Sequence, residues 1–218
     1  MKTDMDLQHD VLEELKWEPS VNAAHIGVAV NNGVVTLSGH VPSYGEKNAA
    51  ERAAKRVYGV KAVADELDVK LPGSLKRTDE DIAQACVNAL RFNYALPGDK
   101  IKVIVEKGWV TLEGQVEWQY QREIAMSAIR HLAGVRGASN SITVKPQAVL
   151  PADVQGKIEA AFRRSAELDA RRIGVEVHDG KVILYGTVRS FAERDEAQQA
   201  AWAAPGVTKI ENQITVSA

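Results

Sequence analysis

The chain has 218 residues, of which 27 are basic and 29 are acidic, so its formal net charge at pH 7 is −2. This near-neutral balance argues against a general nucleic-acid-binding protein, which usually carries a clear basic excess. The single cysteine, Cys86, excludes an intramolecular disulfide framework.

The chain begins with a polar, acidic segment, Met1–Asp10, which lacks the basic start and the apolar centre of an export signal. No later segment stays apolar for the roughly 20 residues that a membrane-spanning helix needs. We therefore expect a cytoplasmic protein without a transmembrane segment. The alternative is a periplasmic protein whose export signal has been removed.

One order of elements is predicted three times along the chain, and each unit opens with an amphipathic helix. Its apolar stripe has the spacing i, i+4, i+8 in every copy, which is typical of one buried helix face. Cys86 occupies a leucine or isoleucine position of this stripe, so we predict a core residue and not a nucleophile. The three stripes are Leu7, Val11 and Leu15, then Ile82, Cys86 and Leu90, then Val154, Ile158 and Phe162.

Two strands joined by a tight turn follow each opening helix. Apolar residues alternate with polar or small ones on both sides of the turn, as in half-buried strands. Asn-Gly and Asp-Gly are strong signals for a two-residue hairpin turn, because both turn residues adopt positive φ. The three turns are Asn32-Gly33, Lys107-Gly108 and Asp179-Gly180.

A second glycine stands six residues after each turn glycine, on the inward face of the second strand. Its missing Cβ is expected to let a helix backbone approach the sheet closely. A second helix, expected near residues 44–57, 119–132 and 191–203, turns mostly alanine inward, and a third glycine ends it. The second and third glycines are Gly39 and Gly59, Gly114 and Gly134, and Gly186 and Gly206.

A third apolar strand closes each unit, and the helical crossover places it parallel to the second strand. The predicted fold class is α+β: three tandem α-β-β-α-β units, each a three-stranded mixed sheet with two helices on one face. Short proline-containing linkers set the unit boundaries at residues 1–72, 73–147 and 148–218. Because units of this size bury little surface on their own, contacts between units are expected.

The glycines Gly33, Gly39 and Gly59, with their apolar strand pattern, recur in register as Gly108, Gly114 and Gly134 and as Gly180, Gly186 and Gly206. In this pattern the chain resembles three tandem BON domains, the bacterial osmotically inducible and nodulation domain family, over essentially its whole length. The resemblance implies a stress-associated or transport-associated bacterial protein that binds phospholipid, especially anionic lipid, or a protein partner. It carries no catalytic residues.

Two surfaces are candidates for binding. The sheet face turned away from the helices is partly apolar, through Trp109, Ile183 and Tyr185, and we expect it to pack against a neighbouring unit. The other surface is the junction between second strand and second helix, where aromatic and basic residues could enter a membrane interface. Its candidate lipid- or partner-binding residues are Tyr44, Trp118, Tyr120, Arg122 and Phe191, for which a packing role is the alternative.

Nothing in the sequence assembles catalytic groups: the five histidines are scattered, and no phosphate loop, zinc spacing or serine elbow occurs. We therefore predict no enzymatic activity, no cofactor and no metal. The leading function is a non-enzymatic binding protein that engages anionic phospholipid or a membrane-associated protein. The alternative is a protein-interaction scaffold with no lipid contact.

Overall fold

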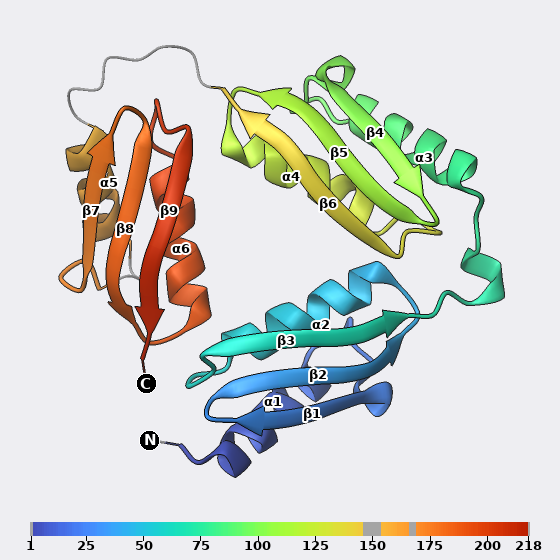
Figure 1. Cartoon of the computed structure of the whole chain (residues 1–218), viewed down its shortest axis with the longest axis horizontal. Coiled ribbons are helices and arrows are strands. Elements are labelled where there is room, and N and C mark those ends of the chain that lie inside the picture. The colour runs from blue at the N-terminus through green and yellow to red at the C-terminus, as the bar shows by residue number, and fades with distance from the viewer. Residues whose placement is uncertain (1, 146–153, 166–168, 218) are drawn as a thin grey trace.

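A computed structural model describes residues 2–145, 154–165 and 169–217 of the chain (Figure 1). Three short 3-10 turns, η1 (Ala23–His25), η2 (Gly73–Leu75) and η3 (Gly98–Lys100), accompany the helices and strands. Unit 1 contains α1 (Asp4–Trp17), β1 (Ile26–Asn31), β2 (Val34–Val41), α2 (Tyr44–Arg56) and β3 (Ala62–Val69). Unit 2 contains α3 (Asp79–Arg91), β4 (Ile101–Glu106), β5 (Trp109–Val116), α4 (Gln119–Arg130) and β6 (Gly137–Val144). Unit 3 contains α5 (Val154–Arg164), β7 (Ile173–His178), β8 (Lys181–Val188), α6 (Phe191–Trp202) and β9 (Lys209–Val216).

Each unit is a three-stranded mixed sheet, which confirms the predicted fold class and topology. The second strand lies in the middle, antiparallel to the first strand and parallel to the third. Both helices of a unit cover the same face of its sheet (Figure 1). The predicted helix stripes are buried and form the centre of a separate hydrophobic core in each unit, with Cys86 fully buried among them.

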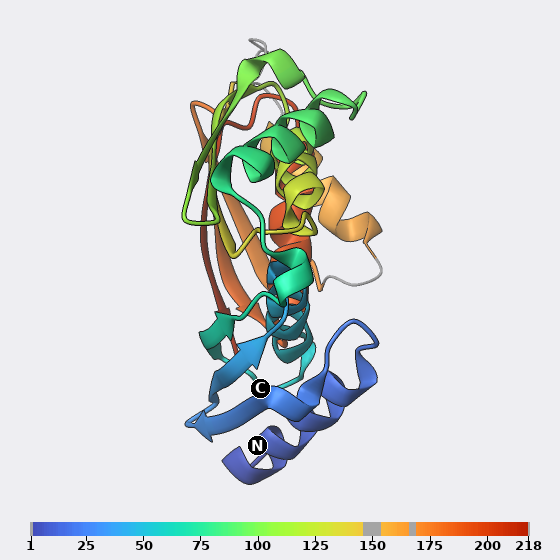
Figure 2. The ribbon, with the colours of Figure 1, turned by 90° about the vertical axis from the view of Figure 1, so that its right-hand side faces the viewer.

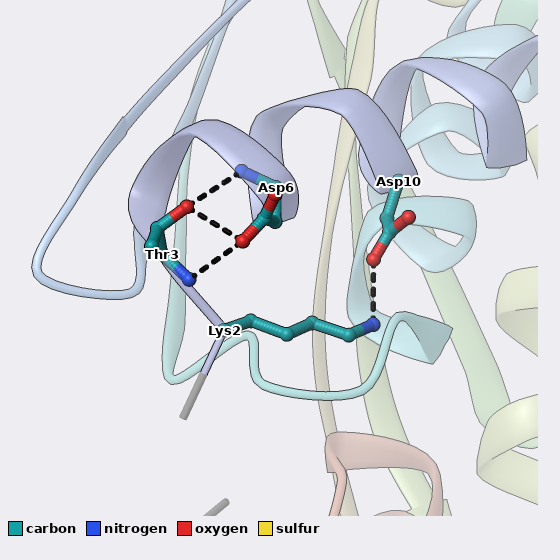
Figure 3. Close-up of polar contacts among 4 residues, drawn as sticks. All are labelled: Lys2, Thr3, Asp6 and Asp10. Atoms are coloured by element: carbon teal, nitrogen blue, oxygen red, sulfur yellow. Dashed lines mark hydrogen bonds and ion pairs between the residues drawn. The ribbon is translucent and has the colours of Figure 1, made fainter.

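The opening helix of unit 1 begins with a capping box (Figure 3). The Thr3 hydroxyl accepts the backbone N–H of Asp6 at 3.2 Å, and the Thr3 N–H donates to the Asp6 carboxylate at 3.1 Å. The Thr3 hydroxyl also donates to the Asp6 carboxylate at 2.7 Å. This bond, together with the one from the Thr3 backbone N–H, lowers the pKa of Asp6, since both favour the ionised carboxylate. Thr78 and Asp81 repeat the arrangement in unit 2. Residues 151–153, which precede the opening helix of unit 3, lie outside the described residues.

In units 1 and 2, an aspartate in the first turn of the opening helix also binds the backbone of the hairpin turn, a contact that was not predicted from the sequence. The Asp79 carboxylate accepts the backbone N–H groups of Lys107 at 2.7 Å and Gly108 at 2.8 Å. Asp4 accepts the two turn N–H groups of unit 1 in the same way, at 2.7 Å and 3.0 Å. All three turns have positive φ at both central residues, as their sequences predict.

The expected role of the second glycine is wrong in one respect. A Cβ on Gly114 would lie 2.2 Å from the carbonyl oxygen of Lys100, and the corresponding neighbours of Gly39 and Gly186 are the carbonyl oxygens of His25 and Arg172. The close neighbour is therefore the backbone just before the first strand, and not a helix. Gly114 pairs with Ile101, the first residue of β4, so the residue before that strand passes directly over the glycine.

The three units surround a common centre, with the third strand and the second helix of each unit on the side that faces it (Figure 1). The three third strands run in the same rotational sense around this centre (Figure 1). Each sheet lies in front of its helices in this view, and the side view in Figure 2 places sheets and helices toward opposite sides. The molecule thus has one broad face made of sheets and one made of helices.

Candidate functional site

The second helices, α2, α4 and α6, form three contacts between units, which we call junctions. In each junction the start of one helix lies near the end of another. In the first junction, the start of α2 lies against the end of α4. Tyr44 packs there on the core of unit 2, and a Cβ on Gly45 would lie 2.5 Å from the His131 ring. Burial, together with the nearby Arg52, lowers the pKa of Arg130 at the end of α4. An aromatic ring of unit 1 thus packs on the core of unit 2 beside a cation, and we call a junction with such a ring closed.

In the second junction, the start of α6 lies against α2. Phe191 packs on the core of unit 1 although the two units are not consecutive in the chain. Asp195 of α6 lies within electrostatic range of Lys55 and Glu51 of α2, and these two residues form an ion pair of 2.8 Å. This junction is also closed, and it joins the ends of the chain into a ring of units.

The third junction, between the start of α4 and the end of α6, is open. It forms a groove of about 500 Å³ whose lining is mainly apolar. Gln119 occupies the position that Tyr44 and Phe191 fill in the other two junctions, so no aromatic plug enters the neighbouring unit. The lining residues are Trp118, Gln119, Tyr120, Glu123, Gln199, Trp202 and Ala203.

The predicted site residues at the strand–helix junctions thus fall into different surroundings. Tyr44 and Phe191 are half-buried between units, which favours the packing alternative for these two. Trp118 and Tyr120 are 38% and 51% exposed and face the open groove. The Arg122 guanidinium donates to the carbonyl oxygen of Asn140 at 3.1 Å and so ties α4 to β6.

The expected packing of the open sheet face against a neighbouring unit is wrong. Trp109 is 51% exposed, its ring covers Gly137 of the adjacent strand, and its indole N–H donates to the Ser139 hydroxyl at 3.0 Å. Tyr185 covers Gly174 in the same way. Because the units join through their second helices, the sheet faces stay open, and the two aromatic rings pack on glycines of their own sheets.

Three exposed aromatic side chains at the ends of the opening helices were missed. Trp17 ends α1 and Phe92 follows α3; they stand at equivalent positions and are 83% and 84% exposed. Tyr94 is fully exposed two residues later. Each of the first two follows a basic residue, Lys16 or Arg91. The sequence signal that could have identified them is an aromatic residue outside the buried stripe, directly after a basic residue, in two of the units.

Cys86 is predicted to resist thiol reagents in the native protein. Burial raises the pKa of its thiol to about 11, so the reactive thiolate is scarce at neutral pH and the sulfur is also shielded. At pH 8 we expect negligible labelling by Ellman's reagent over minutes, and complete labelling after unfolding in guanidinium chloride. Rapid stoichiometric labelling of the folded protein would contradict the core placement.

Within the described ranges, no cluster of three or more His, Cys, Asp or Glu residues is placed to hold a metal ion. The same residues contain no helix with the length and apolarity needed to cross a bilayer.

Comparison with known protein families finds the same domain three times along the chain. The BON domain matches residues 3–70, 78–146 and 152–218. Osmotically-inducible protein Y of Escherichia coli (strain K12) is 33% identical over 130 residues, which are 58% of this chain and 65% of that protein. The alignment thus spans less than two thirds of that relative's length.

Among solved structures, the C-terminal domain of CdsD, a structural protein of the type III secretion system of Chlamydia trachomatis, aligns with all of both chains at 17% identity. A second CdsD structure aligns over 97% of this chain and 92% of that chain, also at 17% identity. Both have a TM-score of 0.28, which is too low to support an argument. The family assignment rests on the three domain matches, which together cover nearly the whole chain, and by them this protein belongs to the BON domain family.

Proposed function

We propose that this protein is a non-enzymatic, osmotic-stress-associated binding protein that attaches to phospholipid surfaces through the ends of its opening helices. Membership of the BON domain family and similarity to a protein named for osmotic induction support the stress association. The attachment to lipid is supported by one observation above all: exposed aromatic rings recur beside basic residues at equivalent helix ends.

Packing within the protein does not explain the presence of Trp17 and Phe92. Each leaves more than four fifths of its surface in water. Aromatic rings of this kind partition favourably into the headgroup region of a bilayer, and neighbouring Lys16 and Arg91 would be attracted to anionic lipid. In unit 3 the same helix end carries Arg163 and Arg164, so all three copies are basic there.

The arrangement of the units would let these helix ends act together. The opening helices of all three units lie on the side of the molecule opposite the sheets, so one membrane surface could contact their ends together (Figure 2). Each contact is weak, but contacts made by linked units add in free energy and produce avidity. Near-neutral total charge is compatible with this mechanism, because only the helix ends need to be basic.

Co-sedimentation with anionic vesicles tests the proposal. The triple variant Trp17→Ser/Phe92→Ser/Tyr94→Ser is expected to bind about tenfold more weakly, a loss of about 1.4 kcal/mol. Binding of the unaltered protein should rise with anionic lipid content and fall with salt. Ile104→Ser is the matched control, because Ile104 is an exposed apolar residue on the sheet face. Equal binding by the triple variant and the unaltered protein would contradict the proposed surface.

A scaffold without lipid contact is the second candidate, and the open sheet faces favour it. Ile104 of β4, Trp109 of β5 and Tyr185 of β8 are exposed, and the sheets together form one side of the molecule (Figure 2). Such a broad, partly apolar face suits a protein partner. Absence of sedimentation with any vesicle at low salt would favour this candidate over attachment to lipid.

A further inference from the structure

We propose that the open groove between α4 and α6 binds a small organic cation that carries a quaternary ammonium group. Two tryptophan rings and one tyrosine ring line the groove: Trp118 and Tyr120 from the start of α4, and Trp202 from the end of α6. Aromatic rings that surround a cavity attract alkylated ammonium ions, because the π faces are negative and the methyl groups make apolar contacts.

The other two junctions indicate which component the groove lacks. In both of them a helix start provides an aromatic ring and the facing helix end carries a cation. Arg130 lies within electrostatic range of Tyr44, and Lys55 lies within electrostatic range of Asp195, one helical turn after Phe191. Trp202 stands at the position of these two cations in the third junction. The groove therefore has additional aromatic surface where its counterparts have a positive charge, and a cationic ligand would supply the charge that this junction lacks.

The charge of the lining agrees with a cationic ligand. None of the residues that line the groove is basic, and Glu123 supplies a carboxylate. Glu123 forms no ion pair within the described part of the chain; it accepts only the Gln119 side-chain N–H, at 3.2 Å. The buried Oε1 of Gln119 has no hydrogen-bond partner among the same residues. A ligand with a hydroxyl group beside its ammonium group, as in choline, would supply both a charge and a donor.

The test uses the full chain and choline as the probe, observed through the NMR line width of its methyl groups. Choline is expected to bind saturably, with a dissociation constant on the order of 1 mM, as a few cation–π contacts imply. Its neutral isostere 3,3-dimethylbutan-1-ol has the same shape without the charge and should bind at least about tenfold more weakly. Equal affinity for the two compounds would overturn the proposal.

Two variants give the groove the residues that stand at the same positions in the closed junctions. Trp202→Lys introduces the cation present at Lys55, and Gln119→Phe introduces the plug present at Phe191. Both are expected to abolish choline binding, whereas Trp202→Phe should retain most of it and so guards against a loss caused by misfolding. Trp17→Phe is the remote control. Undiminished binding by Trp202→Lys would refute the site.

The source of the ammonium group is decided by a parallel experiment with neutral phosphatidylcholine vesicles. Binding of free choline without uptake of vesicles assigns the site to a soluble compound. Vesicle binding that is lost in Trp202→Lys assigns it to a lipid headgroup, and absence of both kinds of binding overturns the proposal. The site is independent of the helix-end aromatics, since the Trp17→Ser/Phe92→Ser/Tyr94→Ser variant should bind free choline normally.

Discussion

Replacement of Gly114 by alanine is expected to lower the free energy of unfolding of the middle unit by about 3 kcal/mol. Two costs combine. Gly114 has a φ of 143°, which side-chain-bearing residues rarely adopt. An added Cβ would also lie 2.2 Å from the Lys100 carbonyl oxygen, which is backbone and cannot rotate away. Relief of this clash requires the start of β4 to separate from β5.

Urea denaturation of the full chain, followed by circular dichroism, measures this effect. Gly73→Ala is the matched control, because Gly73 has no heavy atom within 4 Å of the added Cβ and lies in the linker turn. The control should unfold at the urea concentration of the unaltered protein. An unfolding transition of Gly114→Ala that coincides with that of the control would contradict the described close approach.

The behaviour of Gly114 also illustrates how far the sequence alone could predict the fold. Strand alternation placed it correctly on the helix-covered face of the sheet, and the repeat predicted topology and helix stripes correctly. Alternation states which face a residue occupies, but not which group approaches it. The neighbour is a carbonyl from the residue before β4. Its position depends on how the chain enters that strand, and the periodicity of the sequence contains no information about that entry.

The candidate site was less predictable, because it lies between units. From the sequence, Tyr44, Phe191, Trp118 and Tyr120 form one class, the aromatic residues between the second strand and the second helix. The structure separates them, since the first two enter neighbouring cores and the last two line an open groove. Local patterns do not determine how three units pack together. Comparison of position 119 with its equivalents would, however, have identified the third junction as the exceptional one.

Replacement of Phe191 by alanine is expected to open the ring of units. Phe191 joins unit 3 to unit 1, and no linker connects these two units directly. Loss of a half-buried aromatic ring at this contact should cost about 2 kcal/mol, below the range for a fully buried phenylalanine. We expect a larger radius of gyration in small-angle X-ray scattering and earlier unfolding of unit 1. Tyr44→Ala should expand the chain less, because a short linker still holds units 1 and 2 together.

Gln119→Ala is the matched control for the opened ring, since Gln119 occupies the equivalent position in the junction that has no plug. It should change neither the scattering profile nor the unfolding transition. Identical scattering by Phe191→Ala and the unaltered protein would mean that the contact between α6 and α2 does not hold the units together. Opening of the ring should also weaken choline binding in the groove. The two walls of the groove belong to units 2 and 3, and Phe191→Ala would release unit 3 from unit 1.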